Sequence, residues 1–167
     1  EPQLAAALDK ARSAWDGDRL EQVCRDIASH GRALLSLAEQ GRTASEAVRA
    51  DTASCERLRR AIDSKERSAR EEALRATDNP SAASAQLESL RTQAREELEF
   101  MEEEEALQKE MGAARQGRDA AALKSLLVAA GKLVAKSAAA GTEISTRDGG
   151  IVSEMGIARD DMKRWDD

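Results

Sequence analysis

The sequence predicts an all-α protein, an elongated helical bundle of about six helices built around a long antiparallel helical hairpin. The composition is one observation behind this prediction, because 35% of residues are charged, 2% are aromatic and only two are proline. A second is that apolar residues recur at spacings of three and four along most of the chain. The third is a strong turn signal, Asn79-Pro80, between two such stretches.

The hairpin is predicted from two apolar stripes that mirror each other about Asn79-Pro80. A residue before proline is disfavoured in the α region, and asparagine forms turns readily, so the chain is expected to reverse there. The facing pairs would be Leu58 with Met101, Ile62 with Leu98, Lys65 with Ala94, Ala69 with Leu90, and Ala73 with Leu87. The predicted hairpin core is Leu58, Ile62, Ala69, Leu87, Leu90, Leu98 and Met101.

Charge favours the same register. Bases outnumber acids from Arg57 to Arg75, and acids outnumber bases from Glu88 to Glu105. The residues predicted to set the register are Arg57, Arg59, Arg60, Glu99, Glu102 and Glu103. Exposed ion pairs contribute only ~0.2–1 kcal/mol each, so they would select orientation while burial of the stripes supplies the stability.

Residues 1–78 are predicted to form a first three-helix unit. Its helices are expected over about residues 3–16, 18–40 and 43–77. Gly41 is interpreted as the glycine that follows a helix end, and Thr43 with Glu46 as a capping box that starts the next helix.

Residues 81–167 are predicted to form a second three-helix unit. Its helices are expected over about residues 81–116, 119–140 and 143–166. Gly117 and Asp119 give a stop signal followed by an N-cap, whereas Gly149-Gly150 weaken the start of the last helix.

An internal repeat of about 100 residues is predicted to relate the two halves. Gly17, Gly31 and Gly41 recur as Gly117, Gly131 and Gly141. The alternative is chance matching in an alanine-rich helical chain. The unit is similar in length and helix count to spectrin-type three-helix repeats, but it lacks their aromatic-rich core and is not assigned to that family.

The residue inventory argues against catalysis. His30 is the only histidine, so a metal cluster of several histidines cannot be built from this chain. Phosphate-loop, dinucleotide-binding and nucleophile-elbow motifs do not occur. The sequence therefore predicts a protein that is not an enzyme, with no catalytic, cofactor-binding or metal-binding residues and no cofactor.

Charge and cysteine content limit the environment. The net charge of −6 and the pI of about 5.1 argue against a nucleic-acid partner. Lysines interrupt the longest apolar stretch, Leu123–Ala140, so membrane insertion is not expected. Cys24 and Cys55 are interpreted as small buried thiols rather than a disulfide, which favours a cytoplasmic location.

The predicted function is that of a non-catalytic α-helical scaffold or spacer. The chain opens at Glu1-Pro2 without methionine, so it is expected to be a segment of a larger protein, one class being cytoskeletal. The alternative is an adaptor bundle that binds a partner's amphipathic helix in an apolar groove. The residues predicted for that partner surface are Ile151, Met155, Ile157 and Trp165. The partner is expected to be a protein, and self-association stays an alternative.

Overall fold

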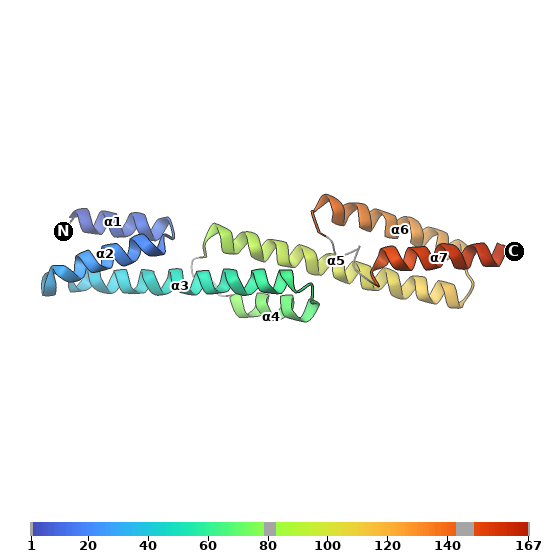
Figure 1. The fold of residues 1–167 in the computed structure, drawn as a ribbon, viewed down its shortest axis with the longest axis horizontal. Helices are drawn as coiled ribbons and strands as arrows, with labels where there is room; N and C mark the ends of the chain where they lie inside the picture. Colours follow the sequence, from blue (N-terminus) through green and yellow to red (C-terminus); the bar gives the residue numbers. More distant parts are fainter. Residues whose placement is uncertain (1, 79–82, 143–148, 167) are drawn as a thin grey trace. The chain divides into compact units, whose positions relative to one another are not determined.

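The protein is all-α, as its sequence predicts. The computed structural model describes residues 2–78, 83–142 and 149–166. Across these residues it has seven α-helices, one short 3₁₀ helix and no strand. The elements are α1 (Pro2–Ser13), α2 (Gly17–Ser29), η1 (Gly31–Leu34), α3 (Leu35–Asp63), α4 (Arg67–Thr77), α5 (Ala85–Gln116), α6 (Ala120–Ala139) and α7 (Ile151–Asp166) (Figure 1).

The chain divides into two compact units. The first unit contains residues 1–63 and 72–91, and the second contains residues 64–71 and 92–167. Helices α4 and α5 therefore contribute residues to both units. The predicted turn at Asn79-Pro80, where the two predicted domains meet, lies outside the described residues.

The core of the first unit forms where α1 and α2 cover the first half of α3 (Figure 1). Leu20, Val23 and Ile27 recur every three or four residues and give α2 one apolar face. That face packs with Leu8 of α1 and Val48 of α3. Burial of this amphipathic face, more than helix propensity, holds the three helices together.

The core of the second unit forms where α6 and α7 lie along the later part of α5 (Figure 1). Met111 of α5, Leu123 of α6 and Ile151 of α7 are each fully buried. A neighbouring cluster contains Phe100, and the Lys136 ammonium lies 5.0 Å from the centre of its ring. The core is thus made of aliphatic and sulfur-containing side chains with a single phenylalanine at its edge.

Three helix–helix turns share one backbone conformation. In the turns before α2, α4 and α6, the middle residue has a positive φ, 51° at Trp15, 58° at Lys65 and 50° at Arg118. The first and third turns also share a cap. Asp16 accepts a bond from the Arg19 amide at 3.0 Å, and Asp119 accepts one from the Ala122 amide at 2.9 Å.

The predicted helix end at Gly41 is wrong. The helix predicted over 18–40 ends at Ser29, and Gly31, with φ of 66°, starts the 3₁₀ helix that leads into α3. Gly41 lies inside α3, where an added Cβ would stand 2.7 Å from the Cys24 Sγ. This glycine therefore serves close helix approach, and Thr43 bonds to the Glu39 carbonyl at 3.1 Å within the helix instead of capping it.

The predicted helix over 43–77 is also wrong as a single element, because the chain turns between α3 and α4. Lys65 takes the left-handed conformation there, and the Ser64 hydroxyl accepts a bond from the Glu66 amide at 3.3 Å. Neither glycine nor proline marks this turn, so its sequence signal is weak. The last helix begins at Ile151, and residues 143–148 of its predicted range lie outside the described residues.

The glycines proposed as repeat markers do not occupy equivalent positions. Gly17 is the first residue of α2, whereas Gly117 precedes the turn residue Arg118. Gly41 lies within α3, whereas Gly141, with φ of 72°, follows the end of α6. The repeat in that register is therefore wrong. The equivalence that the structure shows is between the turns capped by Asp16 and Asp119.

Candidate functional site

The buried face of α5 carries charged as well as apolar side chains. Its buried residues are Leu87, Arg91, Ala94, Glu97, Phe100, Met101, Glu104 and Met111. Spacings of three and four put most of them on one stripe of the helix. Charged side chains are almost never fully buried unless they are paired, so the partners of these residues define what the stripe does.

Glu97 is joined to α4 by a buried ion pair within the second unit. The Arg70 Nη2 lies 2.7 Å and its Nε lies 2.9 Å from the same Glu97 oxygen, Oε2, and the two side chains are 2% and 7% exposed. The Arg70 Nη1 also lies 3.3 Å from the Glu66 carbonyl oxygen, and Gln93 donates to the other Glu97 oxygen at 3.1 Å. Such a saturated pair fixes how α4 lies on α5 in this unit.

A second, exposed group of ion pairs lies one helical turn away. The Arg67 guanidinium contacts Glu71 at 2.8 Å, Glu102 at 2.8 Å and Glu105 at 2.7 Å. The hydrogen bond with Glu71 raises the pKa of Arg67, which keeps this cation charged at any physiological pH. These contacts run in the same direction as the Arg70–Glu97 pair.

The predicted charge register is wrong. Glu102 pairs with Arg67 rather than with Arg57, Arg59 or Arg60, and Arg60 pairs with Glu56 on its own helix at 3.1 Å. Glu103 bonds to Lys136 of α6 at 2.9 Å, while Glu99 is exposed. The physical reason is the turn at Lys65, which starts a new helix and brings the bases of α4 to α5.

The predicted hairpin core is buried only in part. Leu58, Leu87 and Met101 are buried, while Ile62, Ala69, Leu90 and Leu98 are half-buried. The predicted register placed Ala69 opposite Leu90, but Arg70 contacts Glu97, about two helical turns further along α5. The apolar spacing was right for α5, but the partner residues were not.

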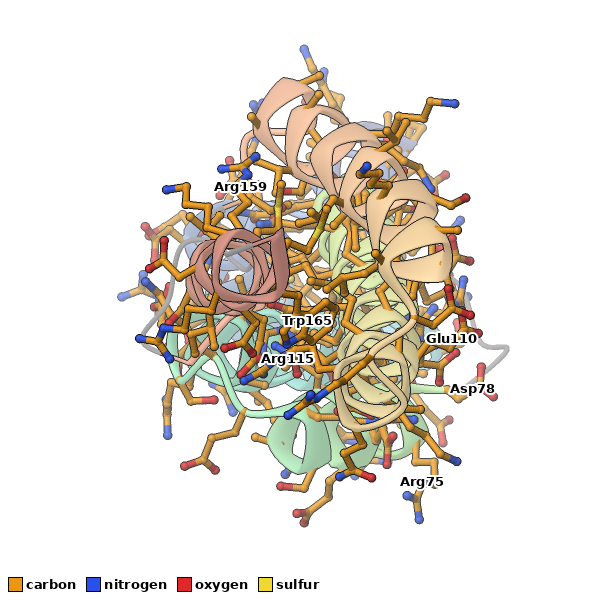
Figure 2. All side chains as sticks on the ribbon, turned by 90° about the vertical axis from the view of Figure 1, so that its right-hand side faces the viewer. Arg75, Asp78, Glu110, Arg115, Arg159 and Trp165 are labelled. Atoms are coloured by element: carbon orange, nitrogen blue, oxygen red, sulfur yellow. The ribbon has the colours of Figure 1, made fainter. Side chains whose placement is uncertain are left out.

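Charged side chains of α5 also hold α7 in the second unit. The buried Glu104 carboxylate accepts a hydrogen bond from the Ile151 amide, the first residue of α7, at 2.6 Å. Arg115 contacts Glu154 at 3.1 Å and Asp161 at 2.7 Å. Figure 2 looks toward the end of this unit and shows Arg115 and Trp165 between α5 and α7.

The residues predicted as a partner surface do not form one exposed strip. Ile151 is 0% exposed and Met155 8% exposed, and both belong to the core of the second unit. Trp165 is half-buried and packs against that core. Only Ile157, at 41%, is well exposed. The excess of apolar residues on α7 is thus used largely by its own unit.

A groove lies along α3 in the first unit. We call it the first-unit groove; its volume is about 1160 Å³. Its walls include Trp15 at the end of α1, Thr77 at the end of α4, and Leu87 and Arg91 on α5. No pattern in the sequence pointed to this groove, because it depends on where α1 and α5 end along α3.

Asp51 ties the start of α5 to α3 beside this groove. Its carboxylate accepts the Ser84 amide at 2.9 Å and the Ser84 hydroxyl at 2.6 Å. The Ser84 hydroxyl oxygen in turn accepts a bond from the Leu87 amide at 3.1 Å, which caps α5. The contact is structural, because each polar group in it already has its partner.

The remaining reactive side chains have local roles. The Nδ1 of the exposed His30 lies 2.7 Å from the Asp26 carbonyl oxygen. Cys24 and Cys55 are free thiols, the first half-buried and the second buried. Burial raises the pKa of the Cys55 thiol, and the nearby Asp51 carboxylate raises it further, so the thiol stays protonated at neutral pH.

Within the described ranges, no three residues among histidine, cysteine, aspartate and glutamate are arranged to hold a metal ion. Among the same residues, no helix combines the length and apolar character that crossing a bilayer requires. No protein-family model, curated protein or solved structure matches the chain.

Proposed function

We propose that the chain is a non-catalytic α-helical scaffold or spacer segment of a larger protein, and that it mediates protein–protein interaction. The observation that carries this proposal is the use of its buried charges. Arg70 and Glu97 join α4 to α5, and Glu104 joins α5 to α7. Carboxylates in an enzyme site face substrate or water, whereas these face other helices of the same chain.

The length and continuity of α5 support a spacer role. This helix runs without interruption for 32 residues, its first turns belong to the first unit and the rest to the second. At a rise of 1.5 Å per residue it is about 48 Å long. We propose an elongated bundle of this kind, of the cytoskeletal class and in the cytoplasm, where free thiols such as Cys24 persist.

An adaptor role is the second candidate, and the first-unit groove favours it. An adaptor would bind an amphipathic helix of a protein partner, or a second copy of the chain, in a groove between its own helices. The groove volume of about 1160 Å³ is in the range of sites that bind ligands. The two roles are compatible, since a spacer can also carry a docking site.

Small-angle X-ray scattering of the full chain tests the spacer role. A compact globule of 167 residues has a radius of gyration of about 15 Å. A spacer is expected to exceed this value clearly and to keep it unchanged between dilute and concentrated samples. A radius of gyration at the globular value would contradict the proposal, and sedimentation equilibrium would separate self-association from an extended monomer.

A further inference from the structure

One exposed face of α3 in the first unit has the pattern of a helix-binding seam. We define the α3 seam by its small or uncharged side chains, which are Ser36, Gln40, Thr43, Ala47, Ala50 and Ser54. They alternate spacings of four and three, the a and d positions of a coiled coil. The first five are exposed and Ser54 is half-buried, and all line the first-unit groove.

The dimensions of the groove fit a helix. From Ser36 to Ser54 the seam spans 18 residue steps, which at the helical rise is about 27 Å. Trp15 borders it at the end of α1, and Leu87 borders it on α5. Small side chains along the floor would allow another helix to approach closely, and the larger ones at the borders would cover its flanks.

A buried arginine in the groove is incompletely bonded. The Arg91 side chain is 8% exposed, and its Nη1 contacts Glu88 at 2.6 Å. Its Nε has no hydrogen-bond partner and is shielded from water. Most buried polar atoms in folded proteins are bonded, and an unsatisfied one destabilises the structure. Arg91 lines the groove, so a ligand there that carries a carboxylate could complete its bonding.

The other charged side chains of the groove have partners. Asp51 accepts two bonds from Ser84, at 2.9 and 2.6 Å. Arg12 pairs with Asp9 at 3.3 Å, and Glu39 lies 3.9 Å from Arg42. The unmet requirement of the groove is therefore positive, and the complementary group is an anion.

We propose that the first-unit groove binds an amphipathic helix of a partner protein, which packs small apolar side chains on the α3 seam and directs one aspartate or glutamate to Arg91. This inference goes beyond the spacer role and does not depend on it. A different protein fits better than a second copy, because two chains of net charge −6 repel each other. The bound carboxylate would give the site its specificity, since a neutral helix would leave the Arg91 Nε unbonded.

A display library of helical peptides tests the proposal on the full chain. The peptides would be 21 residues long, with their seam positions varied among alanine, serine, leucine, glutamine and glutamate. Selected binders are expected to share glutamate at one fixed seam position. Trp15 and Trp165 are the only tryptophans, so a Trp165→Phe chain reports binding through Trp15 fluorescence alone. Replacing the shared glutamate with glutamine is expected to weaken binding at least about tenfold.

Two alanines of α3 give a matched pair of variants. Ala47 lies on the α3 seam, and Ala53 is equally exposed on α3 but does not line the groove. Ala47→Arg is expected to weaken binding at least about tenfold, and Ala53→Arg to leave it unchanged. Arg91→Met should abolish the preference for glutamate over glutamine in the peptide. If that variant does not fold, the glutamate-to-glutamine comparison on unaltered Arg91 decides the same point.

Three outcomes would overturn the proposal. The first is a selection that yields no binder sensitive to Ala47→Arg. The second is a set of groove binders in which glutamate and glutamine are equivalent. The third is a protein that is dimeric by sedimentation equilibrium and becomes monomeric on Ala47→Arg, since a second copy would then occupy the groove.

Discussion

The hairpins α1–α2 and α5–α6 turn in the same way, but each is completed by a third helix that is held differently. Both turns place one residue at positive φ and follow it with an aspartate cap. In the first unit, α3 is then held by apolar contacts and by the close approach of Gly41 to Cys24. In the second unit, Glu104 and Arg115 reach from α5 to α7. Turn geometry is thus local and reusable, whereas attachment of the third helix depends on distant residues.

Removal of one partner of the buried ion pair is expected to have the largest effect. Glu97→Leu leaves the Arg70 guanidinium buried without its carboxylate, which should lower the free energy of unfolding by about 3–5 kcal/mol. Urea denaturation followed by circular dichroism measures this. The matched control is Glu21→Leu in the exposed pair with Arg49 of the first unit, which should cost less than about 1 kcal/mol. Equal losses would mean that burial does not distinguish the two pairs.

Two glycines sharpen the comparison of helix approach in the two units. Gly41→Ala would place a methyl group 2.7 Å from the Cys24 Sγ and should destabilise the fold by about 1–3 kcal/mol. Gly131→Ala would place it 4.0 Å from the Met155 Cε and should instead stabilise α6 by up to about 1 kcal/mol. Thermal unfolding measures both changes. Cys24→Ala should relieve the Gly41→Ala defect, and a Gly41→Ala chain as stable as the parent would refute the close approach.

The attachment of α7 can be broken at Glu104. Glu104→Leu removes the acceptor of the Ile151 amide and should destabilise the second unit by about 1–3 kcal/mol. Hydrogen exchange should show the first turn of α7 losing protection while α1 and α2 keep theirs. Exchange that rises equally in both units would argue against a specific role for this carboxylate.

The two turn caps are expected to be worth the same. Asp16→Ala and Asp119→Ala each remove an acceptor from the first turn of the following helix and should each cost about 1 kcal/mol. Chemical denaturation of the two variants measures the difference. A cap in one unit worth several times that in the other would show that the turns are equivalent in shape only.

The thiols give the smallest effect, one of reaction rate and of pH dependence. Cys55 should be alkylated by iodoacetamide more slowly than Cys24, because it is buried and its pKa is raised. A raised pKa means that the folded state holds the proton more tightly than the unfolded state. Stability contributed by the neutral thiol is therefore present below about pH 8.5 and lost as pH rises above it. Equal labelling rates would place Cys55 on the surface.

The sequence predicts the fold class and the local turns well. Asp119 marks the start of α6 and Asp16-Gly17-Asp18 the start of α2, because a cap acts within one helical turn. Gly41 misled the boundary prediction, since a glycine that ends a helix and one that allows close approach look alike in one sequence. Lys65 gave no warning of the turn before α4, because the left-handed conformation there falls on a residue that rarely adopts it.

The candidate site was harder to predict than the fold. The acidic run Glu102–Glu105 was correctly expected to meet bases, but the bases depended on the unforeseen turn at Lys65. Glu104 and Glu97 could not be recognised as buried, because charged residues on an apolar stripe are indistinguishable from interruptions of it until their partners are known. Arg91 was likewise hidden within α5.

The central claim is that the buried charges serve to join helices, and a double-mutant cycle at Arg70 and Glu97 tests it most directly. The cycle compares Arg70→Met, Glu97→Leu and the double variant by urea denaturation. We expect a coupling energy above about 2 kcal/mol, with the double variant far more stable than either single one. Effects that add to within about 0.5 kcal/mol would show that the two side chains do not act as a pair, and would contradict the account.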